Sequence, residues 1–216
     1  MKNISRKKFL GRLGFGLASI PLTLKGISAA TMGNSTKNET DCGYTDPATE
    51  GPFFVKNTAK TVNINFTNLP GNPMRVSGTI YGDTEGRVLV PSAKIEIWHC
   101  DDEGVYHPTG SGDISKYKDT QVALRGYVIS DENGKYSFRS IVPGLYAGRR
   151  RHIHYKISAQ GFKTLTTQSY WLSEKGDQRS QIDRTDRNTE ECRYIDFKKQ
   201  KNGFHKGEFD IFLKKI

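Results

Sequence analysis

Cysteine is scarce in the sequence, and the few cysteines are not arranged as metal ligands. The 216 residues include three, Cys42, Cys100 and Cys192, and no CxxC pair. Because structural zinc sites use closely spaced thiolates or imidazoles, this spacing predicts no zinc site. An odd count leaves at least one thiol free, so at most one disulfide forms within the chain, and the sequence leaves its pairing open.

Acidic residues and long apolar runs are both absent from residues 1–30. This segment has a basic start, a modestly apolar, glycine-rich middle, and small residues at Ser28–Ala30 where a peptidase could cut. Arg12 and Lys25 interrupt its apolar run, which is too short for a permanent membrane span. We expect a removable export signal with a twin-arginine-like sequence at Ser5–Leu10, and an ordinary secretory signal is the alternative. The protein would then be exported, periplasmic or secreted, in a bacterium.

The formal net charge of +10 would suggest an acidic partner such as nucleic acid. However, six basic residues and no acidic ones lie in residues 1–30, so removal of that segment leaves an unremarkable charge. We therefore expect no nucleic-acid partner. Residues 31–41 are polar and predict a flexible tether, whereas residues 42–216 are long enough to bury a core and are expected to form one domain.

No stretch between residues 42 and 216 shows a long, well-capped helical period. Strand-like alternation is common instead, as where Ala93, Ile95 and Ile97 alternate with Lys94, Glu96 and Trp98. DENG at residues 131–134 is typical of a turn between antiparallel strands. Further strands are expected at residues 74–82, 127–130, 135–141, 151–159 and 208–213. We predict an all-β protein with an antiparallel β-sandwich core and long connecting loops.

Two histidines, His152 and His154, lie one residue apart in the expected strand at residues 151–159. Side chains at i and i+2 of a strand share a face, so both imidazoles project together while Ile153 and Tyr155 turn toward the core. Such a pair can hold a metal, although histidines in a basic stretch are more often solvated, and the pair alone is a weak indication. No H-x-D/E pattern lies nearby, which argues against the facial triad of iron(II) oxygenases.

Two tyrosines occupy positions from which phenolates could complete such a site. Tyr146 lies on a glycine-flanked loop just before the histidine pair, and Tyr106 follows the expected strand at residues 93–98. A phenolate is a hard, anionic oxygen donor that favours iron(III). Two phenolates with two imidazoles would therefore stabilise iron(III) over iron(II).

Four motifs together resemble the intradiol ring-cleavage dioxygenases, although none is specific by itself. They are TEGPFF at 49–54, IEIWHCDDEGVYH at 95–107, PGLYAGRRRHIHYKI at 143–157 and LTTQSYW at 165–171. The resemblance covers nearly all of residues 42–216. It implies a β-sandwich that binds one mononuclear, non-haem Fe(3+) ion through two tyrosines and two histidines, which here are Tyr106, Tyr146, His152 and His154.

The resemblance also implies roles for individual side chains. Tyr146 would be the ligand that the substrate displaces. Arg149 would lie against the bound ring and stabilise the negative charge that develops on it, and Gln168 would help to orient the ring. Arg150 and Arg151, which follow Arg149, are expected at the rim or surface, where they would tune substrate entry.

With O2, an enzyme of this kind cleaves a catechol-type ring between its two hydroxylated carbons and gives a muconate-type diacid. The expected partners are a small aromatic diol and O2, and homo-oligomerisation is left open. The alternative is an exported, non-enzymatic, transthyretin-like β-sandwich binding module. Such a module would have no reason to keep the complete set of two tyrosines and two histidines.

Overall fold

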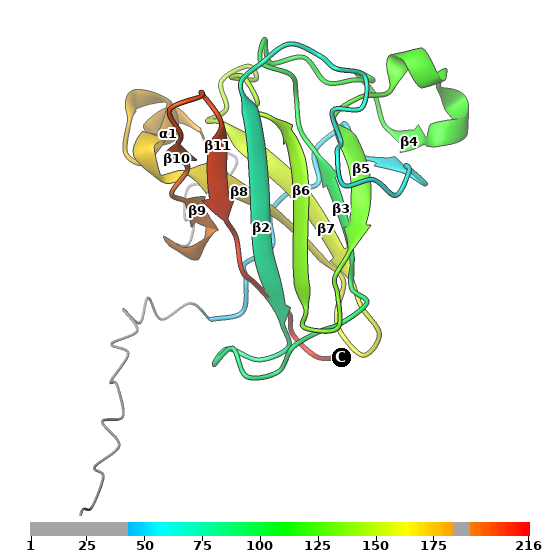
Figure 1. The fold of residues 1–216 in the computed structure, drawn as a ribbon, viewed down its shortest axis with the longest axis vertical. Coiled ribbons are helices and arrows are strands. Elements are labelled where there is room, and N and C mark those ends of the chain that lie inside the picture. Colours follow the sequence, from blue (N-terminus) through cyan, green and yellow to red (C-terminus); the bar gives the residue numbers. More distant parts are fainter. Residues whose placement is uncertain (1–42, 184–190) are drawn as a thin grey trace, which may run out of the picture. The chain divides into compact units, whose positions relative to one another are not determined.

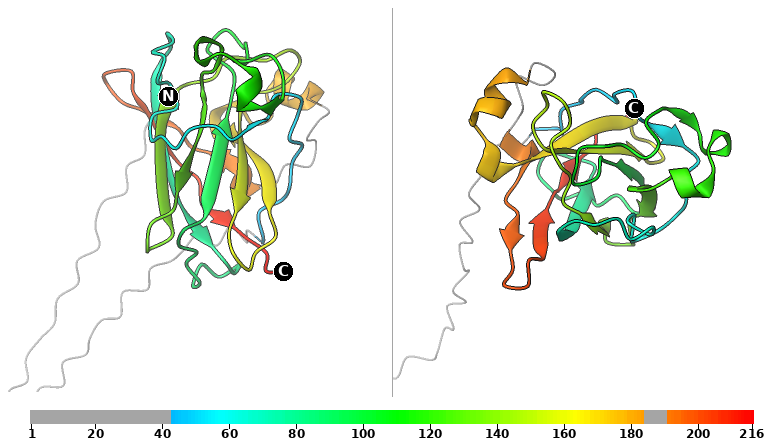
Figure 2. Two further views of the ribbon diagram at one scale, coloured as in Figure 1. Left: turned by 90° about the vertical axis from the view of Figure 1, so that its right-hand side faces the viewer. Right: turned by 90° about the horizontal axis from the view of Figure 1, so that it is seen from above.

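The fold places two β-sheets face to face, which is the sandwich that the sequence predicts. The computed structural model describes residues 43–183 and 191–216. The predicted export signal at residues 1–30 and the tether at residues 31–41 lie outside the described residues. Figure 1 shows β2 and β6 crossing in front of β7, and Figure 2 shows the same layers edge-on.

One sheet contains five strands in the order β5-β3-β7-β8-β9, and its first four strands are antiparallel. The other contains β10, β11, β2 and β12, with β6 paired to β2. A short parallel pair, β1 with β4, lies apart from both. The strands are β1 Val55–Lys56, β2 Pro73–Tyr81, β3 Lys94–Trp98, β4 Gly112–Asp113, β5 Arg125–Ile129, β6 Lys135–Ile141, β7 His152–Ser158, β8 Leu165–Trp171, β9 Tyr194–Ile195, β10 Lys198–Lys199, β11 His205–Glu208 and β12 Ile211–Phe212.

The core lies between the two sheets, where the alternating apolar residues of both meet. Ile95 and Ile97 of β3 and Ile153 and Tyr155 of β7 are almost completely buried, as the period-2 pattern predicts. From the other sheet, Phe138 of β6 packs into the same cluster. Burial of this many large apolar side chains supplies the main driving force for folding, at about 25 cal/mol per Å² of apolar surface.

The predicted strand at residues 208–213 is divided in the structure. Glu208 ends β11, and Ile211 begins β12, while both strands run parallel to β2. Between them, the Phe209 carbonyl crosses so close to Gly78 that a Cβ there would lie 1.9 Å from it. Only glycine fits this crossing, which explains why β2 carries a glycine in its middle. The prediction of a continuous strand was therefore wrong at this point.

Helices among the described residues are short. The α-helix α1, Gln178–Ile182, is accompanied by single 3-10 turns at Ile114–Lys116, Asp119–Gln121, Leu172–Glu174 and Glu191–Arg193. No helix in this part of the chain is long and apolar enough to cross a membrane. Of the cysteines, Cys100 is a buried free thiol and Cys192 is disulfide-bonded, while Cys42 lies outside the described residues.

Candidate metal centre

Strand β7 presents His152 and His154 on the face opposite Ile153 and Tyr155, and both imidazoles are buried. Their ring centroids are 4.9 Å apart. The Nδ1 atom of His152 lies 2.7 Å from the Arg150 carbonyl oxygen, so Nδ1–H donates there and Nε2 keeps its lone pair. That lone pair faces Tyr106, whose hydroxyl oxygen is 3.1 Å from Nε2.

His154 is fixed by packing rather than by hydrogen bonds. Its ring stacks on Trp98 at 4.8 Å and 10°, so Trp98 packs against the site as well as against the core. A Cβ at Gly51 would lie 3.5 Å from Cε1 of His154, in ordinary van der Waals contact, and the φ of +70° at Gly51 favours glycine. The Nδ1 atom of His154 is buried and has no hydrogen-bond partner among the described residues.

The loop after β3 carries Tyr106 and is organised by one carboxylate. Asp101 Oδ1 accepts hydrogen bonds from the backbone N–H groups of Glu103 and Val105, and Oδ2 lies 2.7 Å from Nε2 of His107. Burial would raise the pKa of Asp101, but these hydrogen bonds outweigh it and lower the pKa. The ionised carboxylate therefore holds the turn that delivers Tyr106 to the histidine pair.

The loop between β6 and β7 carries Tyr146 and is fastened against the Tyr106 loop. The Gly144 N–H donates to the Asp101 carbonyl at 2.6 Å. A Cβ at Gly104 would lie 2.4 Å from the Leu145 carbonyl oxygen, and one at Gly144 would lie 2.2 Å from the Asp102 carbonyl oxygen. The two loops thus touch backbone to backbone, which side chains at either glycine would prevent.

Aromatic contacts bring the two tyrosines together. The rings of Tyr106 and Tyr146 meet edge-to-face with centroids 5.4 Å apart. Phe53 stacks on Tyr106 at 4.2 Å and meets the edge of Tyr146 at 5.4 Å. Tyr106 is buried and Tyr146 is half-buried, so Tyr146 lies nearer the solvent.

Arg125 is a supporting residue that the sequence analysis missed. It is buried, and its guanidinium donates to the carbonyl oxygens of Phe53, His107 and Pro108 at 2.6, 2.6 and 3.3 Å. Burial lowers its pKa to about 10, which still leaves it charged at neutral pH. It joins the Phe53 segment to the Tyr106 loop. An arginine beginning a strand gave no sequence signal of this, because the acceptors at Phe53, His107 and Pro108 are backbone atoms distant in sequence.

Arg149 and Gln168 contact one another in the structure. Gln168 lies opposite His154 in the β7–β8 ladder and is completely buried. Its Oε1 accepts from Nη2 of Arg149 at 2.8 Å and from the Tyr170 hydroxyl at 3.0 Å. Its Nε2 donates to the Thr49 carbonyl at 2.7 Å. Gln168 therefore orients the Arg149 guanidinium, and its predicted contact with the substrate ring stays a prediction.

Burial leaves Tyr106, His152 and His154 neutral in the absence of a cation. It lowers the pKa of His152 to about 4 and that of His154 well below its ordinary value, with nearby positive groups adding to the effect. It raises the pKa of Tyr106 far above that of a free phenol, because the phenolate would lose its water. A buried phenolate at neutral pH would therefore need a cation beside it.

These residues fit a metal ion that takes both nitrogen and hard oxygen ligands. Two neutral imidazoles offer lone pairs, two phenols can exchange protons for a cation, and one buried imidazole nitrogen has no partner. Among the described residues no group of three or more His, Cys, Asp or Glu side chains could hold a metal, so no competing site of that type is present there. The assignment of Tyr106, Tyr146, His152 and His154 as ligands stays a prediction.

The expected rim or surface position was wrong for Arg150. Arg150 is buried rather than at the surface, and its guanidinium lies 3.8 Å from the centroid of the Tyr170 ring. Arg151 is half-buried, pairs with Glu174 at 2.7 Å and donates to the Pro143 carbonyl. Both arginines are held by contacts from distant parts of the chain, which a local run of positive charge cannot reveal.

The two remaining histidines near the site, His99 and His107, form hydrogen bonds with other residues. His99 is buried, with Nδ1 2.6 Å from the Cys100 carbonyl and Nε2 2.7 Å from the Ser140 hydroxyl, so both nitrogens are occupied. Nε2 of His107 lies within hydrogen-bond distance of Oδ2 of Asp101. Both are structural.

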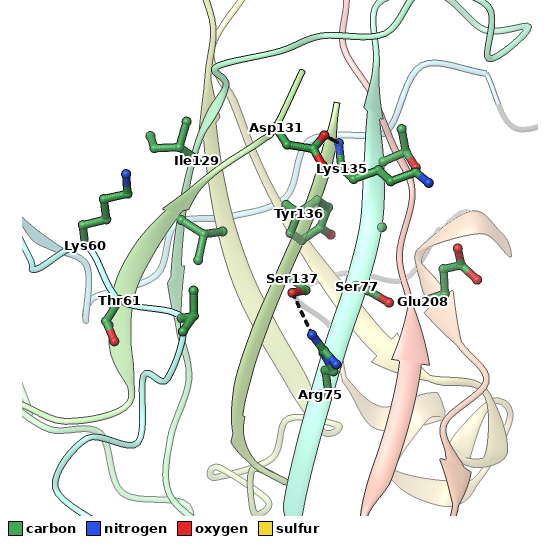
Figure 3. A pocket seen from close by; sticks show the side chains of 14 residues that line it. Lys60, Thr61, Arg75, Ser77, Ile129, Asp131, Lys135, Tyr136, Ser137 and Glu208 are labelled. Atoms are coloured by element: carbon green, nitrogen blue, oxygen red, sulfur yellow. Dashed lines mark hydrogen bonds between the residues drawn. The ribbon is translucent and has the colours of Figure 1, made fainter. Parts of the chain in front are cut away.

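A groove of about 570 Å³ lies elsewhere on the molecule, along β2, β5 and β6. Figure 3 shows its side chains, among them Lys60, Arg75 and Lys135, together with Asp131 and Glu208. None of the proposed ligands lines it. This groove is therefore separate from the proposed metal centre.

Comparison with known proteins agrees with this geometry. The dioxygenase family model matches residues 49–213, which include all four proposed ligands. The chain belongs to the intradiol ring-cleavage dioxygenase family. The sequence is 32% identical over 142 residues to the catechol 1,2-dioxygenase of Acinetobacter baylyi, covering 55% of this chain and 43% of the relative. It is 29% identical over 161 residues to the hydroxyquinol 1,2-dioxygenase of Nocardioides simplex, covering 65% and 52%.

Solved structures of the family share the fold. One is the dioxygenase domain of a dioxygenase and carbohydrate-binding protein fusion from Streptomyces sp. SirexAA-E, with a TM-score of 0.65, 28% identity and coverage of 80% of this chain and 99% of that chain. Another is the catechol 1,2-dioxygenase of Acinetobacter sp. ADP1, with a TM-score of 0.63, 26% identity and coverage of 81% and 64%. The chain spans about half the length of the curated relatives it matches.

Proposed function

We propose that this protein is a non-haem iron(III) dioxygenase that cleaves a catechol-type ring between its two hydroxylated carbons and releases a muconate-type diacid. The observation that carries the proposal is the convergence of two phenols and two neutral imidazoles in one buried cluster. Relatives named catechol and hydroxyquinol 1,2-dioxygenases support the same reaction class. The family is one of enzymes that use non-haem iron, which favours this proposal over a non-enzymatic binding module.

An iron(III) ion held by Tyr106, Tyr146, His152 and His154 would act as a Lewis acid toward the diol and make its ring reactive toward O2. The protein's own part begins with Tyr146. Because it is the more exposed of the two tyrosines and its hydroxyl has no hydrogen-bond partner among the described residues, it is the ligand best able to move aside. Its Oη atom can then accept a proton from the incoming diol, whose hydroxyl groups must both ionise.

Arg149 supplies the fixed positive charge of the site. Its guanidinium acts electrostatically on Tyr106, His152 and His154, lowering the pKa of each, although burial has the larger effect on all three. Negative charge that develops on the ring during reaction would be stabilised by the same guanidinium. Because Asp183 and Gln168 already hold it, little reorganisation is needed at that moment.

The aromatic side chains around the site would exclude water from the face of the bound ring that reacts. Phe53, Trp98 and Tyr106 form one apolar cluster around the histidine pair. A planar, uncharged ring would replace water there with little loss of hydrogen bonding. This favours a small, uncharged catechol-type ring as substrate, such as catechol or hydroxyquinol, and homo-oligomerisation is left open.

The reaction is tested by oxygen uptake with iron-loaded protein and a panel of catechol, hydroxyquinol and protocatechuate. We expect one O2 to be consumed per ring, and both atoms of ¹⁸O2 to appear in the diacid. Extradiol products, in which the ring opens beside the two hydroxylated carbons, would contradict the proposal. So would an absence of uptake with every diol by protein that contains stoichiometric iron.

We further propose that the protein is exported, as the composition of residues 1–30 predicts. The disulfide at Cys192 supports this, because disulfides persist mainly in oxidising compartments. Cell fractionation of the full chain tests it: the mature protein should lie in the periplasmic or extracellular fraction and lack the first segment. Retention of the intact chain in the cytosol would contradict it.

A further inference from the structure

The carboxylate of Asp183 lies at the back of Arg149. It is nearly inaccessible to solvent, and both of its oxygens accept from Nε of Arg149 at 2.9 Å. Its Oδ2 also accepts from the backbone N–H of Arg150 at 3.2 Å. One side chain therefore fixes both the guanidinium of Arg149 and the backbone that leads into β7.

The segment that carries Asp183 also contacts the backbone of the loop at residues 147–150. Helix α1 directly precedes Asp183. From it, Arg179 donates to the Ala147 carbonyl at 2.5 Å and to the Arg149 carbonyl at 3.3 Å. Residues 178–183 thus hold the 147–150 loop through its backbone and through the Arg149 side chain, from a position 34 residues away in sequence.

The two partners of Arg149 leave part of its guanidinium for the site. Asp183 engages Nε, and Gln168 engages Nη2 at 2.8 Å. Within residues 43–183 and 191–216, Nη1 of Arg149 forms no hydrogen bond. Because a planar guanidinium held at two corners cannot rotate, the direction of its remaining N–H groups is fixed.

We propose that Asp183 is a positioning residue for Arg149: it sets the direction in which the guanidinium faces the substrate ring. This inference rests on the proposed function. The same carboxylate also lies 3.6 Å from Nε of Arg150. It acts by holding Arg149 in place, with Gln168 as the second anchor.

Asp183→Asn tests the proposal, because asparagine keeps the shape of the carboxylate but turns an NH2 group toward the guanidinium. A misplacement of a positioned group costs about 10²-fold in rate, and we expect kcat to fall by about that factor. Because charge on the ring develops only in the transition state, KM should change little. Iron content and the tyrosinate absorption band should also be unchanged. Asp196→Asn, at an exposed carboxylate paired with Lys198, is the matched control and should have no effect.

A double-mutant cycle separates positioning from a general structural role. If Asp183 acts through Arg149, the variant Arg149→Ala, Asp183→Asn should be no slower than Arg149→Ala alone. Losses that multiply would overturn the proposal, and so would a wild-type kcat in Asp183→Asn.

A measurement on metal-free protein keeps this test apart from the test of the reaction. The Nε–H signal of Arg149, assigned by nuclear magnetic resonance with the Arg149→Lys variant, should be protected from hydrogen exchange in the wild type. Asp183→Asn should remove that protection, and Asp196→Asn should keep it. Unchanged protection in Asp183→Asn would overturn the positioning role even if no diol is turned over, whereas a lack of turnover with lost protection would count against the proposed function alone.

Discussion

The proposed site has two halves that are built in different ways. His152 and His154 lie on β7, the middle strand of a five-stranded sheet, whose ladder partners on both sides hold their backbone. Tyr106 and Tyr146 lie on loops that are held by one carboxylate, two glycines and a stacked phenylalanine. A sheet interior is among the most stable parts of a fold, while loops move at lower cost.

This difference agrees with the proposed chemistry. A pair of imidazoles should keep the metal in place throughout the reaction, and the strand provides that. At least one tyrosine must move when the diol arrives, and Tyr146 lies on a loop and is half-buried. Substitutions can disrupt each half of the site separately.

Removal of a strand ligand should have the largest effect. His154→Ala should lose most of its iron and most of its turnover. Loss of a contact outside the ligand shell costs up to about 10²-fold in affinity or activity, so loss of a ligand should cost at least that. Metal analysis and kcat measure the two losses. His205→Ala, in β11, is the control, and equal iron content in both variants would contradict the assignment of His154.

Loss of the support for the Tyr106 loop should have the second largest effect. Arg125→Gln would remove the guanidinium donors to the carbonyl oxygens of Phe53 and Pro108, whereas the carbonyl oxygen of His107 would keep the Ala123 N–H at 3.2 Å. We expect about 3 kcal/mol of lost unfolding free energy, since each unsatisfied buried group costs about 1–3 kcal/mol. Denaturant unfolding measures this, and Arg139→Gln on the exposed side of β6 is the control. A difference below about 1 kcal/mol would show that Arg125 does not hold the loop.

The contact between the tyrosine loops should be sensitive to one methyl group. Gly144→Ala would place a Cβ 2.2 Å from the Asp102 carbonyl oxygen, whereas at Gly148 a Cβ would meet nothing within 4 Å. Overpacking costs about 1–3 kcal/mol, and the loops must separate to relieve it. We expect Gly144→Ala to lose turnover and tyrosinate absorption more than iron, and Gly148→Ala to match the wild type. Equal behaviour of the two variants would contradict the close contact.

Acid should destabilise the metal-free protein through its buried histidines. Burial lowers the pKa of His99 and of His152 to about 4. In the unfolded chain both take up protons below about pH 6.5, but in the folded chain they do so only near pH 4, so stability falls as the pH falls between these values. The slope should approach 1.4 kcal/mol per pH unit for each histidine. His99→Gln should remove about one histidine's share of the slope in urea titrations at pH 6.5, 5.5 and 4.5. An unchanged slope would contradict the burial effect.

The positions of His152 and His154 on a strand could be predicted from the alternation of the sequence. The positions of Tyr106 and Tyr146 near them could be predicted only through the motifs. The alternation around β3 and β7 is local, so it shows both the core residues and the face that carries the histidines. The contacts of Arg125 and Asp183 are not local, because they join segments far apart in the chain. For the same reason the burial of Arg150 was missed, and so was the break between β11 and β12, which depends on Gly78 in another strand.

The central claim is that Tyr106 and Tyr146 share one iron(III) ion with His152 and His154. The visible spectrum of the iron-loaded protein tests it most directly, with Tyr106→Phe, Tyr146→Phe and, as a control on β5, Tyr127→Phe. The account predicts a red-brown protein whose tyrosinate-to-iron(III) band is weakened by each of the first two changes and unaffected by the third. A colourless protein containing stoichiometric iron, or a band that survives both Tyr106→Phe and Tyr146→Phe, would contradict it.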